Sequence, residues 1–270
     1  MNKGCIAFIV EGREREPEII ENISTIFFTG KAIKYITLPA EQNIYMLWEK
    51  MKEDDFDTDL IEVLRESSDD IRKQLFGITR DDFSEIFLFF DYDAHQNNLS
   101  RSGNMENDAN KVIEQMLESF NNETESGKLY ISYPMAEALR DFKIGMCGNG
   151  ENCFVRVSEC GNYKRISAEQ SANPQINTYD FVTWKEIFEA FAKKISCFFG
   201  KKEIFTYEKY ATTVSPITIQ KLEEKQFQEG KVFVISAFPS FIADYFGARL
   251  WNSFLRNTGN HLEKTNCKRK

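Results

Sequence analysis

The sequence predicts an α/β fold, in which a mostly parallel sheet is flanked by helices and followed by a helix-rich C-terminal extension. Two short apolar runs, at residues 4–10 and 86–90, are rich in β-branched and aromatic residues and are bounded by charged ones. Such runs are typical of buried parallel strands. A helical apolar stripe at residues 16–27 and a third apolar run at 33–38 lie between them. This order indicates a β-α-β unit with parallel strands.

The helices of the first half follow from their flanking residues. Pro17, with a glutamate on each side, is expected in the first turn of the first helix, and Gly30 is expected to end that helix. Residues 42–76 form a long, acidic and amphipathic segment, which we expect to fold as two helices separated at residues 54–58.

The remaining elements are predicted from the same periodicities. A helix at residues 106–120, a fourth strand at 129–133 and a short helix at 135–142 complete the first half. Residues 145–177 are expected to be mainly loop with a little strand. In the rest of the chain we expect helices at residues 184–199, 217–227 and 238–254, and a buried strand or core segment at 232–235.

The length of 270 residues allows one large domain or two small ones. We expect a first domain at residues 1–142, with a helical insertion at about 42–77. Residues 143–270 would form a helical or mixed extension that packs on it. The surplus of apolar helices in this second part also predicts a homodimer, although the same helices would equally cover the second face of the sheet.

The composition excludes several classes of protein. Acidic residues number 42 and basic residues 34, giving a net charge of −8, which disfavours broad non-specific binding to nucleic acid. A nuclease with a local basic groove and bound metal remains compatible with this charge. We expect no membrane span and no signal peptide, and therefore a cytoplasmic protein with reduced thiols. Cys147, Cys153 and Cys160 match no zinc-binding spacing and are expected in a glycine-rich surface loop.

Acidic residues follow the first and third predicted strands. Glu11 comes directly after residues 4–10, and Asp91 and Asp93 follow residues 86–90. Because ligands bind at the carboxyl ends of strands in open α/β sheets, we expect these acids to share one crevice. They would repel one another unless a divalent cation lay between them, and carboxylate oxygens suit Mg²⁺. The expected chemistry is metal-assisted phosphoryl transfer or hydrolysis.

The two strand-end motifs resemble the Toprim domain of topoisomerases, primases and OLD-type nucleases. The residues that carry the resemblance are 8–12, Phe-Ile-Val-Glu-Gly, and 89–93, Phe-Phe-Asp-Tyr-Asp. Residues 133–139, Tyr-Pro-Met-Ala-Glu-Ala-Leu, resemble an element of Toprim nucleases in phage-defence systems, such as the AriB effectors of the PARIS system. Residues 163–164 and 236–247 also resemble the AriB type.

This resemblance implies metal-dependent cleavage of phosphodiester bonds, with Glu11 as general acid or base. Asp91 and Asp93 would hold Mg²⁺, or alternatively Mn²⁺. It also implies a toxic effector of an anti-phage defence system that cleaves tRNA and is held inactive by a partner ATPase. The sequence has no GxxxxGK[ST] loop, so the ATPase would be another chain.

Five further residues are candidates, each with a simpler alternative. Glu16 as a metal ligand and Glu137 as a catalytic residue also have a helix-start reason to be acidic. Arg13 and Lys164 would contact substrate phosphates; the alternatives are an ion pair with Glu14 or Glu18 for the arginine, and a solvated surface position for the lysine. His95 would assist a leaving group, but a lone loop histidine usually faces solvent.

Two rival functions stay open at this stage. The negative charge and the many aromatic residues also fit a non-catalytic Toprim-like module that binds a partner and cuts nothing. The third possibility is a Toprim nuclease that acts on DNA rather than RNA. Substitution of Glu11 separates the first rival from a nuclease, because it would abolish cleavage and leave partner binding intact.

Overall fold

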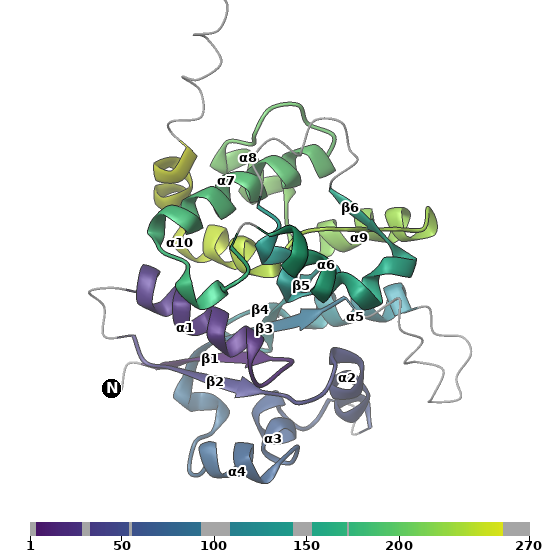
Figure 1. The fold of residues 1–270 in the computed structure, drawn as a ribbon. Helices are drawn as coiled ribbons and strands as arrows, with labels where there is room; N and C mark the ends of the chain where they lie inside the picture. Colours follow the sequence, from purple (N-terminus) through teal and green to yellow (C-terminus); the bar gives the residue numbers. More distant parts are fainter. Residues whose placement is uncertain are drawn as a thin grey trace, which may run out of the picture.

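A computed structural model describes residues 4–28, 33–53, 56–92, 109–142, 153–171 and 173–255. Its centre is a five-stranded sheet with the order β2-β1-β3-β5-β4 (Figure 1). Four strands are parallel and only β4, at one edge, is antiparallel, which confirms the predicted α/β class. The strands are β1 (Cys5–Val10), β2 (Tyr35–Pro39), β3 (Phe83–Asp91), β4 (Asn121–Asn122) and β5 (Gly127–Ser132).

The strand register brings the carboxyl ends of β1, β3 and β5 together. Val10 at the end of β1 pairs with Phe89 of β3, and Asp91 at the end of β3 pairs with Ser132 of β5. The residues that directly follow β1 therefore lie beside the last residues of β3. As predicted, the helix between β1 and β2 is α1 (Arg15–Phe27), and these two strands are parallel.

One face of the sheet is covered by an aromatic layer. Phe8, Phe87 and Phe89 all pack against Phe241 of helix α10 (Ala237–Leu255), with ring centroids 5.7, 4.9 and 5.5 Å apart. Aromatic residues bury large apolar areas and dominate the energetics of cores. These phenylalanines thus fasten α10 onto the sheet.

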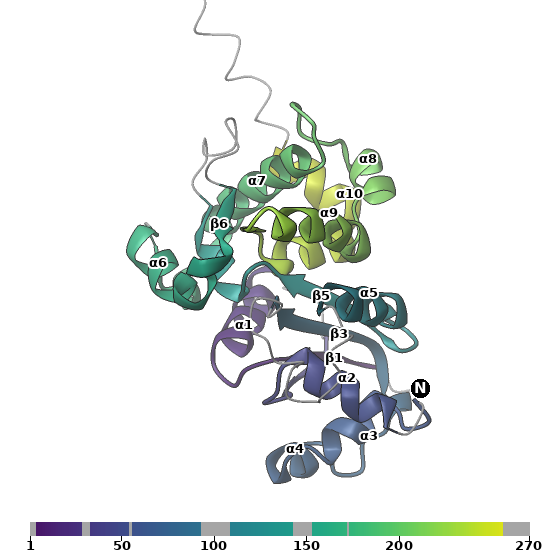
Figure 2. The same cartoon turned by 90° about the vertical axis from the view of Figure 1, so that its right-hand side faces the viewer.

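The acidic segment after β2 differs from the prediction. It contains three short helices, not two: α2 (Ile44–Lys52), α3 (Leu60–Arg65) and α4 (Asp69–Gln74). The second break arises at Ser68, whose hydroxyl accepts a hydrogen bond from the Ile71 N–H and caps α4. Both figures show these helices at the end of the molecule opposite α7 (Phe181–Phe198), α8 (Tyr207–Thr213) and α10 (Figures 1 and 2).

Residues 153–178 are more ordered than predicted. They contain β6 (Phe154–Arg156) and α6 (Tyr163–Gln170), together with the 3-10 helices η5 (Val157–Asn162) and η6 (Ile176–Thr178). The expectation of loop was wrong because α6 is mostly polar and buries only Tyr163 and Ser167, so it has little apolar periodicity. Strand β6 pairs with β7 (Lys231–Phe233) in a second, two-stranded antiparallel sheet.

The other predicted helices are present with small changes of boundary. The helix expected at 135–142 is the 3-10 helix η4 (Ala136–Arg140), and α8 (Tyr207–Thr213) was not predicted. The confirmed helices are α5 (Ala109–Ser119), α7 (Phe181–Phe198), α9 (Pro216–Gln228) and α10. Within the described ranges, none of the helices has the length and apolar character needed to cross a membrane. The division into domains at residue 142 stays a prediction.

The end of helix α1 bears on the prediction that Gly30 terminates this helix. Helix α1 ends at Phe27, and the N–H of Phe28 closes its last turn on the Ser24 carbonyl. Gly30, predicted to end this helix, lies outside the described residues.

Candidate active site

A cleft of about 850 Å³ opens at the carboxyl ends of β1 and β3 and runs along the start of α1. Six of the seven predicted site residues line it, although they come from four separate parts of the sequence. These six are Glu11, Arg13, Glu16, Asp91, Glu137 and Lys164. The seventh, Asp93, lies outside the described residues, as does His95.

The first two acids are oriented by backbone N–H groups. The Asp91 N–H donates to Glu11 Oε2 at 3.0 Å, and the Ala136 N–H donates to Asp91 Oδ1 at 2.8 Å. The first bond joins the end of β1 to the end of β3, and the second joins β3 to the start of η4. Backbone donors are fixed by the fold, so both carboxylates are held in place before any ligand binds.

Glu16 adds a third carboxylate from the first turn of α1. Only 7% of this residue is exposed, which is unusual for a glutamate. Gly12 makes its position possible, because a Cβ atom at residue 12 would lie 3.1 Å from Glu16 Oε2. The glycine after Glu11 therefore leaves room for a second glutamate over the strand ends.

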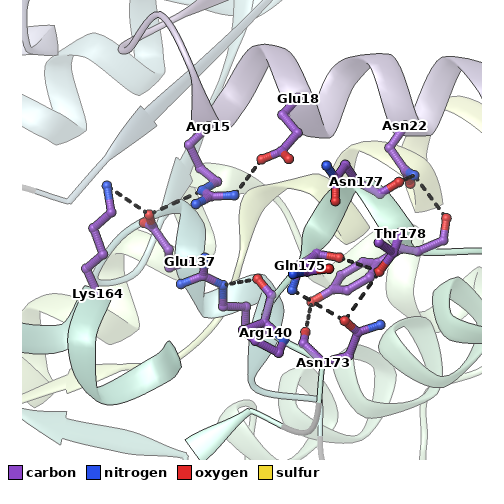
Figure 3. A network of polar contacts seen from close by, with 12 residues as sticks. Arg15, Glu18, Asn22, Glu137, Arg140, Lys164, Asn173, Gln175, Asn177 and Thr178 are labelled. Atoms are coloured by element: carbon purple, nitrogen blue, oxygen red, sulfur yellow. Dashed lines mark hydrogen bonds and ion pairs between the residues drawn. The ribbon is translucent and has the colours of Figure 1, made fainter. Parts of the chain in front are cut away.

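Glu137 brings the fourth carboxylate and the basic groups of the cleft. Its side chain is 5% exposed and forms ion pairs with Arg15 Nε and Lys164 Nζ, each at 3.5 Å (Figure 3). The Lys164 side chain is 68% exposed, so its ammonium group is accessible to a ligand. Arg15 also pairs with Glu18 at 2.5 Å. Two basic side chains of the cleft, Arg15 and Lys164, thus lie next to Glu137.

Burial and like charges perturb two of these acids. Burial raises the pKa of Asp91 well above its ordinary value, and the charges of Glu11, Glu16 and Glu137 raise it further. Burial also raises the pKa of Glu16, with an added contribution from the charge of Glu137. Both shifts mean that the cleft disfavours its own negative charge, and that a bound cation would relieve this cost.

The formal charge of the whole cleft leads to the same conclusion. Seven carboxyl groups and three basic side chains line it, a surplus of four negative charges. The acids are Glu11, Glu14, Glu16, Glu18, Glu21, Asp91 and Glu137, and the bases are Arg13, Arg15 and Lys164. A phosphate could approach the strand ends only after positive charge had been added to them.

The donor chemistry fits a hard divalent cation. Carboxylate oxygens are the ligands of Mg²⁺ and Mn²⁺, and Mg²⁺ usually keeps several waters beside one or two carboxylates. In the ranges that the structure describes, no group of three His, Cys, Asp or Glu side chains forms a ready-made metal centre. Glu11, Glu16 and Asp91 line the cleft at the strand ends, so a cation bound there would take one or two of these carboxylates and complete its shell with water.

Arg13 lines the cleft, and its guanidinium group pairs with two acids from later in the sequence. Arg13 is half exposed and pairs with Glu41 and, at 3.5 Å, with Asp70 of α4. The predicted alternative of a pair with Glu14 or Glu18 is therefore wrong for Arg13. The ion pair with Glu18 is formed instead by Arg15, two residues further along the chain. Arg13 ties the wall of the cleft to the segment of three short helices.

The cysteine segment is not the predicted surface loop. Cys153 and Cys160 are both buried, whereas Cys147 lies outside the described residues. The Cys160 thiol donates to the Arg156 carbonyl, and burial raises its pKa to about 12. A thiol with so high a pKa is a poor nucleophile at neutral pH, so Cys160 has a structural role.

A buried polar network supports the end of β3 from behind, and sequence reasoning missed it. Tyr92, next to Asp91, donates its hydroxyl to Asn110 Oδ1 at 2.5 Å. Gln220 Nε2 donates to the same oxygen at 3.0 Å, and the Tyr133 hydroxyl donates to Gln220 Oε1 at 2.9 Å. The only sequence signal was an amide on the apolar face of each of two helices, α5 and α9.

Comparison with known proteins adds no family to this description. No protein-family model matches the chain, and no curated protein or solved structure is significantly similar to it. The activity is therefore inferred from the residues of the cleft.

Proposed function

We propose that this protein is a nuclease that uses a divalent cation to hydrolyse phosphodiester bonds in this cleft. The observation that carries the proposal is the gathering of Glu11, Glu16, Asp91 and Glu137 at the ends of two parallel strands, with a surplus of negative charge. Mg²⁺, or Mn²⁺, would neutralise phosphate oxygens and activate water there.

The residues of the cleft have distinct parts in this proposal. Glu11, fixed by the Asp91 N–H, is the residue that accepts and returns a proton at the scissile phosphate. Lys164 lies on the open side and binds a non-bridging phosphate oxygen. Glu137 keeps the Lys164 and Arg15 side chains near the strand ends until substrate arrives.

The resemblance of residues 8–12, 89–93 and 133–139 to Toprim nucleases of the AriB type extends the proposal. On that basis the substrate is tRNA, and the chain is the toxic effector of an anti-phage system whose activity is restrained by a partner ATPase. The sequence itself lacks a phosphate-binding loop for ATP, in agreement with a separate ATPase chain. Homodimerisation in the active state is part of the same proposal.

The test is cleavage of total tRNA and of plasmid DNA by purified protein with Mg²⁺ or with a chelator. Discrete tRNA fragments are expected with Mg²⁺ only. Glu11→Gln should reduce their rate of formation by about 10²–10⁴-fold, the usual contribution of an acid–base group. Glu169→Gln is the control, because Glu169 is exposed and pairs with Arg165 outside the lining of the cleft.

Other outcomes select the rival functions. Cleavage of plasmid with intact tRNA would retain the metal site but identify a DNA-directed nuclease. Intact tRNA and DNA in the presence of Mg²⁺, Mn²⁺ and the partner ATPase would contradict the proposal and favour a non-catalytic interaction module.

A further inference from the structure

The cleft extends beyond the four carboxylates to a rim that ends at one side-chain amide, Asn177, with a second amide, Gln175, two residues before it on the same segment. Its lining continues along α1 through Glu18 and Glu21 to Asn177. Asn177 belongs to η6, which packs against α1, so the far end of the cleft is formed by the segment of residues 173–179 (Figure 3). None of the predicted site residues lies on this segment.

The backbone of this segment is held rigidly from three sides. Arg140 Nε donates to the Pro174 carbonyl at 2.9 Å, and the Tyr179 hydroxyl donates to the Asn173 carbonyl at 2.9 Å. Asn22 of α1 donates to the carbonyl of Tyr179 at 2.9 Å. Ile176 and Tyr179 are buried beneath it. The segment is therefore part of the folded framework.

Two amide side chains on this rigid backbone have no hydrogen-bond partner among the residues that the structure describes. Gln175 and Asn177 are exposed, and neither side-chain amide makes a hydrogen bond to another described residue. The side chain of Asn173, in contrast, has partners within the segment. Its Oδ1 accepts hydrogen bonds from the Gln175 N–H and from the Thr178 hydroxyl group. Each of these two amides offers a hydrogen-bond donor and an acceptor side by side. Because the backbone is already fixed, binding a ligand would cost little further backbone entropy.

The charge of the cleft decides which part of a nucleic acid fits here. Glu18 and Glu21 line the stretch between Arg15 and the amide rim, so a phosphate would be repelled along it. Base edges are neutral and match amides well: asparagine and glutamine pair with adenine through two hydrogen bonds. Such edges are accessible when bases are unpaired and turned outwards, as in RNA loops.

We infer that Gln175 and Asn177 form a base-recognition element for unpaired nucleotides a few positions away from the cleaved phosphate, an inference that rests on the proposed nuclease function. The spacing agrees with this. Asn22, which holds the segment, lies seven residues beyond Arg15 on α1, about 10 Å along the helix axis. That distance corresponds to about three stacked nucleotides.

The test is sequence preference, measured on short single-stranded RNA of randomised sequence by sequencing the cut ends. The wild type is expected to prefer particular bases about three nucleotides from the cut. In the double variant Gln175→Ala and Asn177→Ala this preference should fall by about tenfold, with the total cleavage rate on the mixed pool largely retained. Gln228→Ala, an exposed amide on α9, is the control and should leave the preference unchanged.

The outcomes separate this inference from the proposed function. Cleavage by the wild type with the same preference in the double variant would overturn the base-recognition element and leave the nuclease intact. No cleavage by the wild type, together with no binding of labelled RNA in a fluorescence anisotropy titration, would overturn both.

Discussion

Two carboxylates in this protein lie in opposite electrostatic surroundings. Asp244 of α10 accepts hydrogen bonds from Lys128 Nζ at 2.9 Å, from the Tyr130 hydroxyl at 2.9 Å and from the Tyr210 hydroxyl at 3.3 Å. Asp91 accepts one bond from a backbone N–H and has Glu11, Glu16 and Glu137 as charged neighbours. The first carboxylate is paired with an ammonium group, whereas the charged groups that act on the second among the described residues are acids.

The difference in charged neighbours separates an acid with a structural role, Asp244, from a candidate ligand-binding acid, Asp91. The Asp244 charge is matched within its own cluster by one ammonium group and two hydroxyl groups, so it fastens α10 to β5. Among the described residues, the ion pairs of the four acids at the strand ends are those of Glu137 with Arg15 and Lys164. A charge that the fold leaves unmatched is the sign of a ligand of opposite charge.

The largest expected effect is on catalysis at the unmatched cluster. Asp91→Asn keeps an oxygen to accept the Ala136 N–H but removes a negative charge. Cleavage should fall by about 10²–10⁴-fold, because metal and proton transfer both depend on this charge. The same variant should be at least as stable as the wild type in chelator, since it removes repulsion. A chelator-treated variant that melts well below the wild type would contradict this.

The matched cluster should respond in the opposite way. Asp244→Ala leaves the Tyr130 and Tyr210 hydroxyl groups and the Lys128 ammonium group without their acceptor. The free energy of unfolding should fall by about 1–3 kcal/mol, as measured by urea denaturation. Metal dependence of cleavage should be unchanged in the fraction that remains folded. Asp244→Asn, which keeps an acceptor, is the control and should cost less.

A smaller effect is expected where the network behind β3 is cut. Tyr92→Phe removes the hydroxyl that donates to Asn110 Oδ1, which keeps its bond from Gln220. The stability should fall by about 1 kcal/mol, the net value of a typical hydrogen bond. The affinity for Mg²⁺ should fall as well, because the hydrogen bond of the Tyr92 hydroxyl group helps to fix the backbone next to Asp91. Tyr179→Phe, which loses a bond to the Asn173 carbonyl, provides a comparison: an equal loss of Mg²⁺ affinity there would count against the specific role of Tyr92.

The smallest effect concerns the pH dependence of stability. Glu223 is fully buried on α9; its Oε2 accepts the Phe233 N–H, and Oε1 has no partner. Burial raises its pKa well above the ordinary value of about 4.5, so the folded state binds the proton more tightly than the unfolded state. Stability should therefore fall as the pH rises above about 4.5, and the fall continues up to the raised pKa.

Glu223→Gln removes this titration and should give a flatter curve of melting temperature against pH. The slope is compared rather than the absolute stability, because the amide also changes the hydrogen bond to Phe233. Asp91 and Glu16 contribute to the slope with the same sign and are present in both proteins. Parallel curves for the variant and the wild type would exclude an ionisation of Glu223 in this range.

The fold could be predicted from local patterns wherever apolar periodicity was strong. The strands that end at Val10 and Asp91, and helices such as α7, have continuous apolar runs or stripes that few other structures accommodate. Helix α6 and the break before α4 depend on polar residues and on the Ser68 cap, and such features are decided by tertiary contacts. They were missed or misplaced for that reason.

The candidate site could be predicted in part, because strand order alone brings Glu11 and Asp91 together. Glu137 and Lys164 also line the cleft, and the sequence had named both as candidates, each with a simpler alternative. The support from Asn110 and Gln220 and the amide rim at Gln175 and Asn177 could not be foreseen. Their partners lie far away in the sequence, and no local pattern marks an unpartnered amide.

The most direct test of the account is whether the strand-end acids bind a divalent cation. The melting temperature of metal-free protein is measured during titration with Mg²⁺ and with Mn²⁺, for the wild type, Asp91→Asn and Asp244→Asn. A cation that binds only the folded state stabilises it by about 2.7 kcal/mol at one hundred times its Kd. The account predicts this stabilisation in the wild type and in Asp244→Asn, and its loss in Asp91→Asn. No stabilisation of the wild type, or equal stabilisation of all three proteins, would contradict it.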